Sequence, residues 1–145
     1  MEFKVREIEV RYKGASNFPI VTRSQDVAKI ALSNFGHSIE IVEEFKVILV
    51  GANNRIKGIA TISQGGLNQT IVDIRYLFSI ALKGLATSII VVHNHPSGNL
   101  KPSQADKNIT QKIKEAGELL DIPLLDHIII TKSAGYYSFS DHLIL

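Results

Sequence analysis

The sequence contains no cysteine, and this absence excludes two kinds of structure. Disulfide bonds cannot form, and neither can the zinc sites that use thiolate ligands. A chain without cysteine also fits a reducing, intracellular compartment more easily than an oxidising one. We therefore expect a cytoplasmic protein.

Long apolar runs and a strong charge bias are also missing. The longest apolar stretch, SIIVV at residues 88–92, is far shorter than the roughly 20 residues that cross a bilayer, so we expect no membrane partner. Residues 1–13 (MEFKVREIEVRYK) interleave acids and bases and lack the apolar run of a signal peptide. The formal net charge of +2 does not by itself indicate nucleic acid.

The composition and patterning indicate one α/β domain over residues 1–145. Hydrophobic residues make up 45% of the chain, which suits a globular core. Strand-like and helix-like patterns alternate, which predicts a mixed β-sheet flanked by helices. The predicted strands cover residues 3–12, 43–50, 58–63, 88–93, 124–131 and 136–140. Helices are predicted over residues 24–35, after Asp73 and from Ser103.

Two local signals refine the N-terminal part of this prediction. In residues 3–12 the apolar alternation changes phase after Val5, which predicts a bulged or twisted edge strand. Thr22 and Gln25 have the spacing of a capping box at the start of the first helix. The turn-rich stretch GANNRIKG separates the next two strands and predicts a hairpin.

Residues 93–106 (HNHPSGNLKPSQAD) form the most informative segment. His93 and His95 lie at the end of a predicted buried strand, where side chains at positions i and i+2 point to the same face. Pro96 ends the strand, and the turn brings Asp106, in the first turn of the next helix, back toward the histidines. Two imidazoles and a carboxylate leave one position of a tetrahedral zinc open, which is typical of a catalytic site.

The same residues also have simpler interpretations. A pair of histidines one residue apart is a weak signal by itself. Ser103 and Asp106 also fit a helix-capping pattern, which explains these two residues but not the histidines, and which is compatible with a metal site. The three isolated histidines are expected to be structural or solvated: His37, His127 and His142.

A hydrolytic zinc site also needs a general base, and residues 43–50 (EEFKVILV) offer two acids. Glu43 shares its strand phase with apolar residues, whereas Glu44 shares its phase with Lys46, which suggests that the second face meets solvent there. Glu43 is thus the better candidate for an inward carboxylate. Glu44 remains an alternative, as does a pair of solvated acids at a strand end.

Together these residues resemble a known motif. Glu43, followed fifty positions later by the histidine pair, resembles the JAMM motif of the JAB/MPN metallohydrolases, and the resemblance runs from about residue 40 to the end. The segments HNHPSGNLKPSQAD and LLDHIII resemble the RadC-like branch more narrowly. The matching positions are Glu43, His93, Asn94, His95, Pro96, Gly98, Pro102, Ser103 and Asp106.

The resemblance implies a fold related to that of cytidine deaminases and one zinc held by His93, His95 and Asp106. It implies Glu43 as general acid/base and Ser103 as the residue that steadies the oxyanion or the water. The characterised chemistry of the family is hydrolysis of amide or isopeptide bonds. The prediction is therefore a zinc-dependent hydrolase with a peptide or protein substrate.

Two other functions remain as alternatives. Some JAB/MPN proteins keep the fold without the metal and serve as binding modules. The RadC-like branch also carries an old label as DNA repair proteins, which does not follow from the motif, and longer members have an N-terminal helix-hairpin-helix region of the kind that contacts DNA. Residues 1–40 predict a strand and one helix instead, so DNA association is less favoured for this chain.

Overall fold

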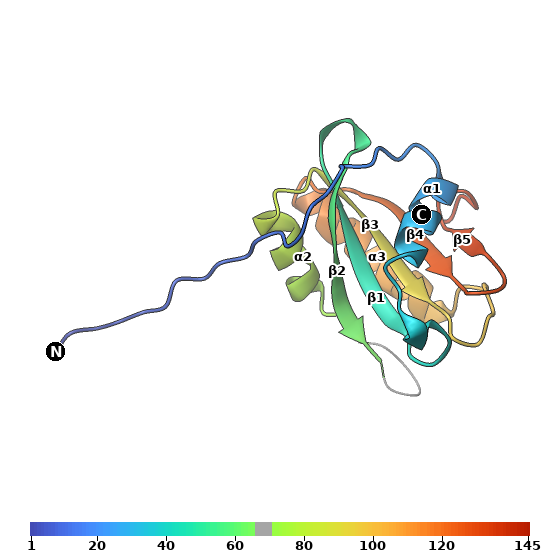
Figure 1. The fold of residues 1–145 in the computed structure, drawn as a ribbon, viewed down its shortest axis with the longest axis horizontal. Helices are drawn as coiled ribbons and strands as arrows, with labels where there is room; N and C mark the ends of the chain where they lie inside the picture. The colour runs from blue at the N-terminus through green and yellow to red at the C-terminus, as the bar shows by residue number, and fades with distance from the viewer. Residues whose placement is uncertain (66–70) are drawn as a thin grey trace.

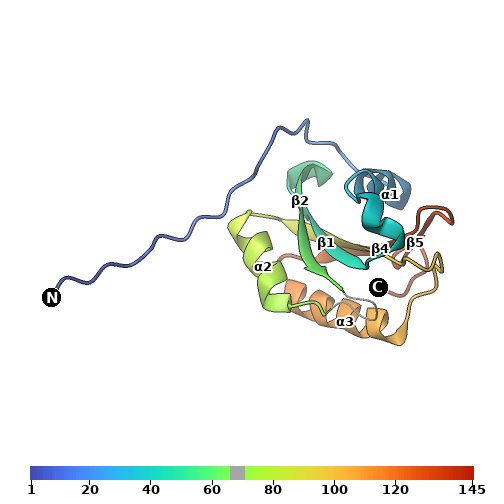
Figure 2. The same ribbon diagram turned by 60° about the horizontal axis from the view of Figure 1, so that its bottom comes forward.

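The computed structural model describes residues 1–65 and 71–145, and within them a mixed five-stranded sheet with helices on both faces (Figures 1 and 2). The strand order across the sheet is β2-β1-β3-β4-β5. The strands are β1 (Glu44–Val50), β2 (Ile56–Gln64), β3 (Ser88–Asn94), β4 (Leu124–Ile130) and β5 (Tyr136–Ser138). The helices are α1 (Ser24–Leu32), α2 (Ile74–Lys83) and α3 (Gln104–Leu119), with short 3₁₀ turns η1 (His37–Glu40) and η2 (Ala52–Asn54). The predicted α/β class with a mixed sheet is confirmed.

Two apolar layers enclose the sheet, one on each face. Helix α1 covers one face, where Ala31 packs with Ile48 of β1, and Figure 2 shows α2 and α3 on the opposite face. On that second face Leu77 and Ile113 pack with Val47 of β1. Every residue of β1 and β3 is buried, because both faces of these central strands are covered.

One parallel pair of strands positions the candidate site. β1 pairs antiparallel with β2, which confirms the predicted hairpin, and also with β3. β3 and β4 are parallel, and α3 makes the connection between them. Because β3 and β4 are parallel, α3 must carry the chain from the carboxyl end of β3 back to the level where β4 begins. Helix α3 therefore begins beside the carboxyl end of β3. The end of β3 and the first turn of α3 are therefore neighbours.

The predicted caps of α2 and α3 are present, but that of α1 is not. Asp73 caps α2 by accepting hydrogen bonds from the amides of Arg75 and Tyr76. Ser103 caps α3 as predicted. The predicted capping box of α1 is wrong: Arg23 holds the N-cap position without a side-chain cap hydrogen bond, and the helix ends at Leu32 rather than at residue 35. Packing of its apolar side against the sheet stabilises α1 instead.

The predicted strand over residues 3–12 is also wrong. This segment is exposed and runs away from the sheet in Figures 1 and 2, with Phe3 and Val5 exposed by 84% and 94%. Tyr12 anchors its end by donating a hydrogen bond to the carbonyl of Gly84 at 2.7 Å. A segment with alternating apolar residues forms a β-strand when it can hydrogen-bond to a neighbouring strand. Here the segment does not pair with β2, the strand at that edge of the sheet.

Membrane-spanning segments are not found in the described part of the chain. None of the helices in residues 1–65 and 71–145 combines the length and the hydropathy that crossing a bilayer requires.

The last turns of α3 depend on a glycine that faces the chain beyond the helix. A Cβ atom on Gly117 would lie 2.4 Å from the carbonyl oxygen of Ile122, which is backbone and cannot rotate away. Alanine usually stabilises a helix relative to glycine by roughly 0.5–1 kcal/mol. We predict that Gly117→Ala instead destabilises the fold by about 1–3 kcal/mol, the usual cost of overpacking.

Urea or thermal unfolding checks this prediction, with Gly36→Ala as the matched control. A Cβ atom on Gly36 would meet no atom within 4 Å, and the backbone there is ordinary for L-residues. The control should unfold close to the wild type. An unchanged or raised midpoint for Gly117→Ala would contradict the packing described here.

Candidate metal centre

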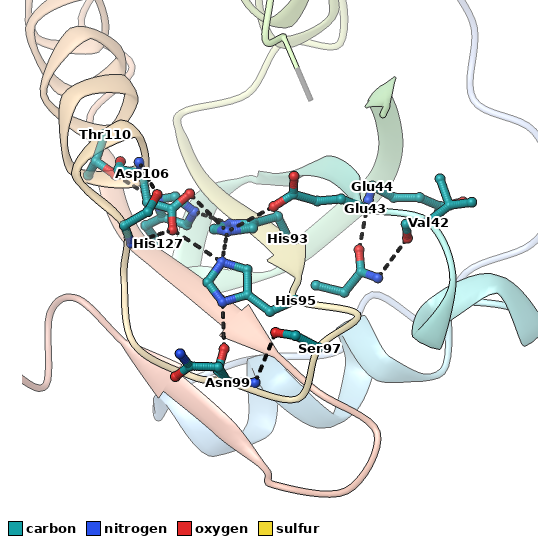
Figure 3. Close-up of polar contacts among 12 residues, drawn as sticks. Val42, Glu43, Glu44, His93, His95, Ser97, Asn99, Asp106, Thr110 and His127 are labelled. Atoms are coloured by element: carbon teal, nitrogen blue, oxygen red, sulfur yellow. Dashed lines mark hydrogen bonds and ion pairs between the residues drawn. The ribbon is translucent and has the colours of Figure 1, made fainter. Parts of the chain in front are cut away.

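Three predicted ligands converge at the end of β3 (Figure 3). The Nε2 atoms of His93 and His95 lie 2.9 Å apart. The Asp106 carboxylate faces both rings, with Oδ1 3.2 Å from Nε2 of His93 and Oδ2 3.1 Å from Nε2 of His95. Each of the three residues thus turns a donor atom toward one point.

Backbone geometry explains how the two histidines reach the same face. His93 occupies β3, and the His95 amide continues the ladder by donating to the carbonyl of Ile130 at 3.1 Å. The chain then turns through Gly98, whose φ of +83° lies in the left-handed region that favours glycine. Nδ1 of His95 lies 2.6 Å from the Asn99 carbonyl. A carbonyl accepts only, so this Nδ1 carries the hydrogen and Nε2 is left available as a ligand.

Asp106 serves the helix and the histidines at the same time. Its Oδ2 accepts a hydrogen bond from the Ser103 amide at 2.8 Å, and its own amide donates to Ser103 Oγ at 3.0 Å. These two bonds form a capping box, and they hold the carboxylate at the helix start where it faces the imidazoles. The capping and metal-site interpretations of Asp106 are therefore compatible in the structure.

The donor set fits a zinc ion. Two ligands about 2.0–2.1 Å from a tetrahedral zinc lie roughly 3.3 Å from each other, and the observed separations of 2.9–3.2 Å are within a few tenths of this value. Among the described residues, His93, His95, Asp106 and Glu43 form a cluster whose ligand atoms all lie within 4.8 Å of one another. Two neutral imidazoles and a carboxylate match the donors that zinc accepts.

The electrostatics of the cluster favour an ionised Asp106. Burial disfavours the charged carboxylate, but the hydrogen bonds that the His93 and His95 rings donate when they are protonated, together with the Ser103 amide, outweigh this effect and hold the pKa of Asp106 far below its ordinary value. Burial opposes the charge on His95 as well, yet the hydrogen bond that a protonated Nε2 would donate to Asp106 raises the pKa of that ring. The cluster therefore carries an anionic ligand at neutral pH.

The structure separates the two candidate bases. Glu43 lies on the histidine side, with its Oε1 3.7 Å from Nε2 of His93, and it lines the same cavity. Glu44 points to the other face, where it pairs with Lys46 at 3.3 Å and accepts a hydrogen bond from Gln64. The expectation that the Lys46 face meets solvent is wrong, because Glu44 and Lys46 are both buried and neutralise each other.

An open cavity of about 710 Å³ surrounds the cluster. Its walls are mixed: Ile41, Ile71 and Ile109 contribute apolar surface, and Lys101 and Lys112 contribute positive charge. Ser103 and Glu43 line it together with the predicted metal ligands. The predicted site residues therefore share one solvent-accessible space.

Sequence reasoning missed the role of Asn94, which lies between the two histidines and points to the opposite face. Its amide nitrogen donates to the carbonyls of Ile39 and Val42, and its oxygen accepts from the Glu44 amide at 2.7 Å. These bonds tie the segment that carries Glu43 to the end of β3. Alternation in the strand places Asn94 inward, but its backbone partners are fifty residues away and could not be inferred.

The sequence also did not predict that His127 contacts the candidate metal ligands. It is buried, as a structural histidine would be, but it is not isolated: its Nε2 lies 2.7 Å from Nδ1 of His93. Burial and the neighbouring His93 hold the pKa of His127 well below its ordinary value, so the ring is neutral. His37 and His142 are not members of the cluster.

We predict that Asn94→Ala lowers the free energy of unfolding by at least about 2 kcal/mol, because three backbone groups, all buried or part-buried, lose their partners. Chemical denaturation measures this change. Asn34→Ala is the control, because Asn34 bonds to Ile30 on the surface and its loss should cost less than about 0.5 kcal/mol. Equal stability losses in the two variants would show that the Asn94 bridge does not hold the Glu43 segment.

The fold and the site together define a class: an α/β domain with a histidine and carboxylate cluster suited to a metal, at the carboxyl end of a central strand. Residues 21–144 match the RadC-like JAB domain family. The chain belongs to this family, which confirms the resemblance to the JAB/MPN proteins and to their RadC-like branch.

Relatives in several bacteria share this domain. The chain is 54% identical over 99 residues to a UPF0758 protein of Flavobacterium johnsoniae, covering 68% of this chain and 43% of the relative. A UPF0758 protein of Caldanaerobacter subterraneus is 41% identical over 126 residues, covering 82% and 53%. A UPF0758 protein of Staphylococcus epidermidis is 40% identical over 140 residues, covering 90% and 61%. The chain thus spans about half the length of these relatives.

Proposed function

We propose that this domain is a zinc-dependent hydrolase that cleaves amide or isopeptide bonds in a peptide or protein substrate. The observation that carries the proposal is the convergence of His93, His95 and Asp106 beside Glu43 in one open cavity. Three protein ligands leave a tetrahedral ion one position for water or substrate, which is the arrangement of catalytic zinc sites. The family membership supports the same chemistry.

A zinc ion bound there would act as a Lewis acid and bring the pKa of a coordinated water to about 7. The carboxylate of Glu43 lies on the histidine side of the strand, with its Oε1 atom 3.7 Å from Nε2 of His93. A water bound beside that ring would therefore lie within reach of the carboxylate. From that place Glu43 accepts a proton from the attacking water and later gives it to the leaving amine. Glu43 therefore acts as base first and acid second.

Ser103 stands at the helix start with its Oγ already accepting a hydrogen bond from the Asp106 amide at 3.0 Å. Its hydroxyl hydrogen remains free to donate into the cavity that Ser103 lines. A fixed donor beside the reacting carbonyl stabilises the oxyanion as it develops. The N-terminus of α3 adds a favourable dipole in the same direction.

Several features favour an enzyme that acts on an extended chain in the cytoplasm. The complete ligand and base set supports a hydrolase over a binding module that lacks the metal. The cavity is open and has both apolar and cationic walls, which suits a peptide segment. The lack of cysteine supports a reducing compartment.

The metal prediction is one zinc per chain, held by His93, His95 and Asp106. Elemental analysis after dialysis against zinc should give near one equivalent for the wild type. Asp106→Asn should weaken zinc affinity, because the site loses its anionic ligand. Asp121→Asn, an exposed acid outside the cluster, is the control and should retain the metal. Full zinc content in a His93→Ala, His95→Ala double variant would place the metal elsewhere.

The catalytic prediction separates Glu43 from Glu44. Glu43→Gln keeps the shape but removes the proton acceptor, so turnover should fall about 10²–10⁴-fold while zinc stays bound. Glu44→Gln removes the charged partner of buried Lys46, so it should lower the unfolding midpoint and spare turnover. Turnover is followed on a panel of peptide and isopeptide substrates that the wild type cleaves. Loss of turnover in Glu44→Gln alone would transfer the role to Glu44.

A further inference from the structure

The ligand nitrogen of a metal-binding histidine depends on what its other ring nitrogen contacts. For His95 that partner is the Asn99 carbonyl, which only accepts, so its tautomer is settled locally. For His93 the partner is Nε2 of His127, at 2.7 Å. A histidine nitrogen can either donate or accept, and a second residue must therefore decide which form His127 takes.

Thr110 is the residue in a position to decide. Its Oγ1 lies 2.6 Å from Nδ1 of His127 and also 2.6 Å from the carbonyl oxygen of Asp106 (Figure 3). A hydroxyl carries one hydrogen, and the Asp106 carbonyl cannot donate. The Thr110 hydrogen therefore goes to Asp106, and Oγ1 must accept a hydrogen from Nδ1 of His127.

The remaining hydrogens follow along the chain of contacts. His127 is fully buried, and neither residue that contacts its ring nitrogens is an acid, so a positive charge there would be uncompensated. With its single hydrogen on Nδ1, the neutral ring accepts at Nε2. His93 must then donate from Nδ1, which leaves Nε2, the nitrogen that faces Asp106 and His95, as the position where a metal could bind.

Packing keeps this arrangement rigid. The His127 ring stacks on Phe139 with centroids 4.5 Å apart, and it makes an edge-to-face contact with Phe45 at a centroid distance of 5.6 Å. Thr110 is buried in α3, one turn beyond Asp106, so the same helix presents both the carboxylate and the hydroxyl. The ring cannot turn over without breaking both aromatic contacts and two short hydrogen bonds.

We infer that Thr110 and His127 are positioning residues, which form a buried hydrogen-bond relay that fixes His93 in the tautomer able to bind a metal through Nε2. The relay runs from the Asp106 carbonyl through Thr110 and His127 to His93. One helix turn thus supplies an anionic ligand directly and orients a neutral ligand from behind. The consequence for metal binding rests on the proposed zinc site, whereas the hydrogen positions do not.

The first test reads the tautomers directly. Nitrogen-15 NMR of uniformly labelled, metal-free wild-type protein distinguishes protonated from unprotonated ring nitrogens. We expect His127 to carry its hydrogen on Nδ1 and to be unprotonated at Nε2. A hydrogen on Nε2 of His127 would overturn the relay, whatever the protein does with zinc.

The second test changes the hydroxyl without changing the shape. Thr110→Val should move the His127 hydrogen to Nε2, because Nδ1 has lost its acceptor, and should weaken zinc binding about 10–100-fold, the usual effect of losing an outer hydrogen-bond partner of a ligand. Thr110→Ser keeps the hydroxyl and should restore both the tautomer and the affinity. Competition with a chromophoric chelator measures zinc affinity on folded protein.

Ser138→Ala provides the control for a merely structural effect. Ser138 is buried and bonds to Asp126, which points to the other face of β4, so this variant should lose stability without losing zinc affinity. Unchanged zinc affinity in Thr110→Val, or equal affinity losses in Thr110→Val and Ser138→Ala, would reject the relay. If the wild type binds no zinc at this site, the proposed function fails, and the nitrogen shifts still decide the relay.

Discussion

The rest of the site depends on the contacts of the Asp106 carboxylate. It closes the first turn of α3 and meets two imidazoles at the end of β3, so a single group joins a helix to a central strand. A half-buried carboxylate is costly unless hydrogen bonds compensate it, and this one accepts a hydrogen bond from the Ser103 amide and faces both imidazoles. The same contacts that stabilise the helix start therefore assemble a metal-binding geometry.

The alternation of strand side chains sorts the neighbouring residues into two roles. On the α3 face, Glu43 and His93 line the cavity, and His127 supports His93 from behind. On the α1 face, Asn94 ties the end of β3 to the start of β1, and Glu44 and Lys46 form a buried ion pair within β1. Adjacent residues in the sequence thus carry chemistry and support respectively, because a strand turns successive side chains to opposite faces.

Much of the fold was predictable where the signal is local. The continuous apolar run of β3, the apolar stripe of α2 and the caps at Asp73 and Ser103 each depend on a few neighbouring residues, and the structure has these elements. The segment at residues 3–12 has an equally clear alternation but forms no strand, since a strand requires a partner that local sequence does not specify. The capping box predicted at Thr22 is absent for a related reason: packing of α1 against the sheet stabilises the helix more than a cap at its first turn would.

The sequence by itself determined the types of donor and their spacing: two histidines one strand period apart, a carboxylate at a helix start, and acids before a buried strand. Tertiary structure decided which acid faces the cluster, that Lys46 is buried, and that His127 and Thr110 stand behind His93. These outcomes depend on β1, β3 and β4 lying side by side across more than thirty residues of chain. Hydrogen bonds of that kind follow from strand register and helix placement, which are set by burial of the two apolar layers rather than by any local pattern.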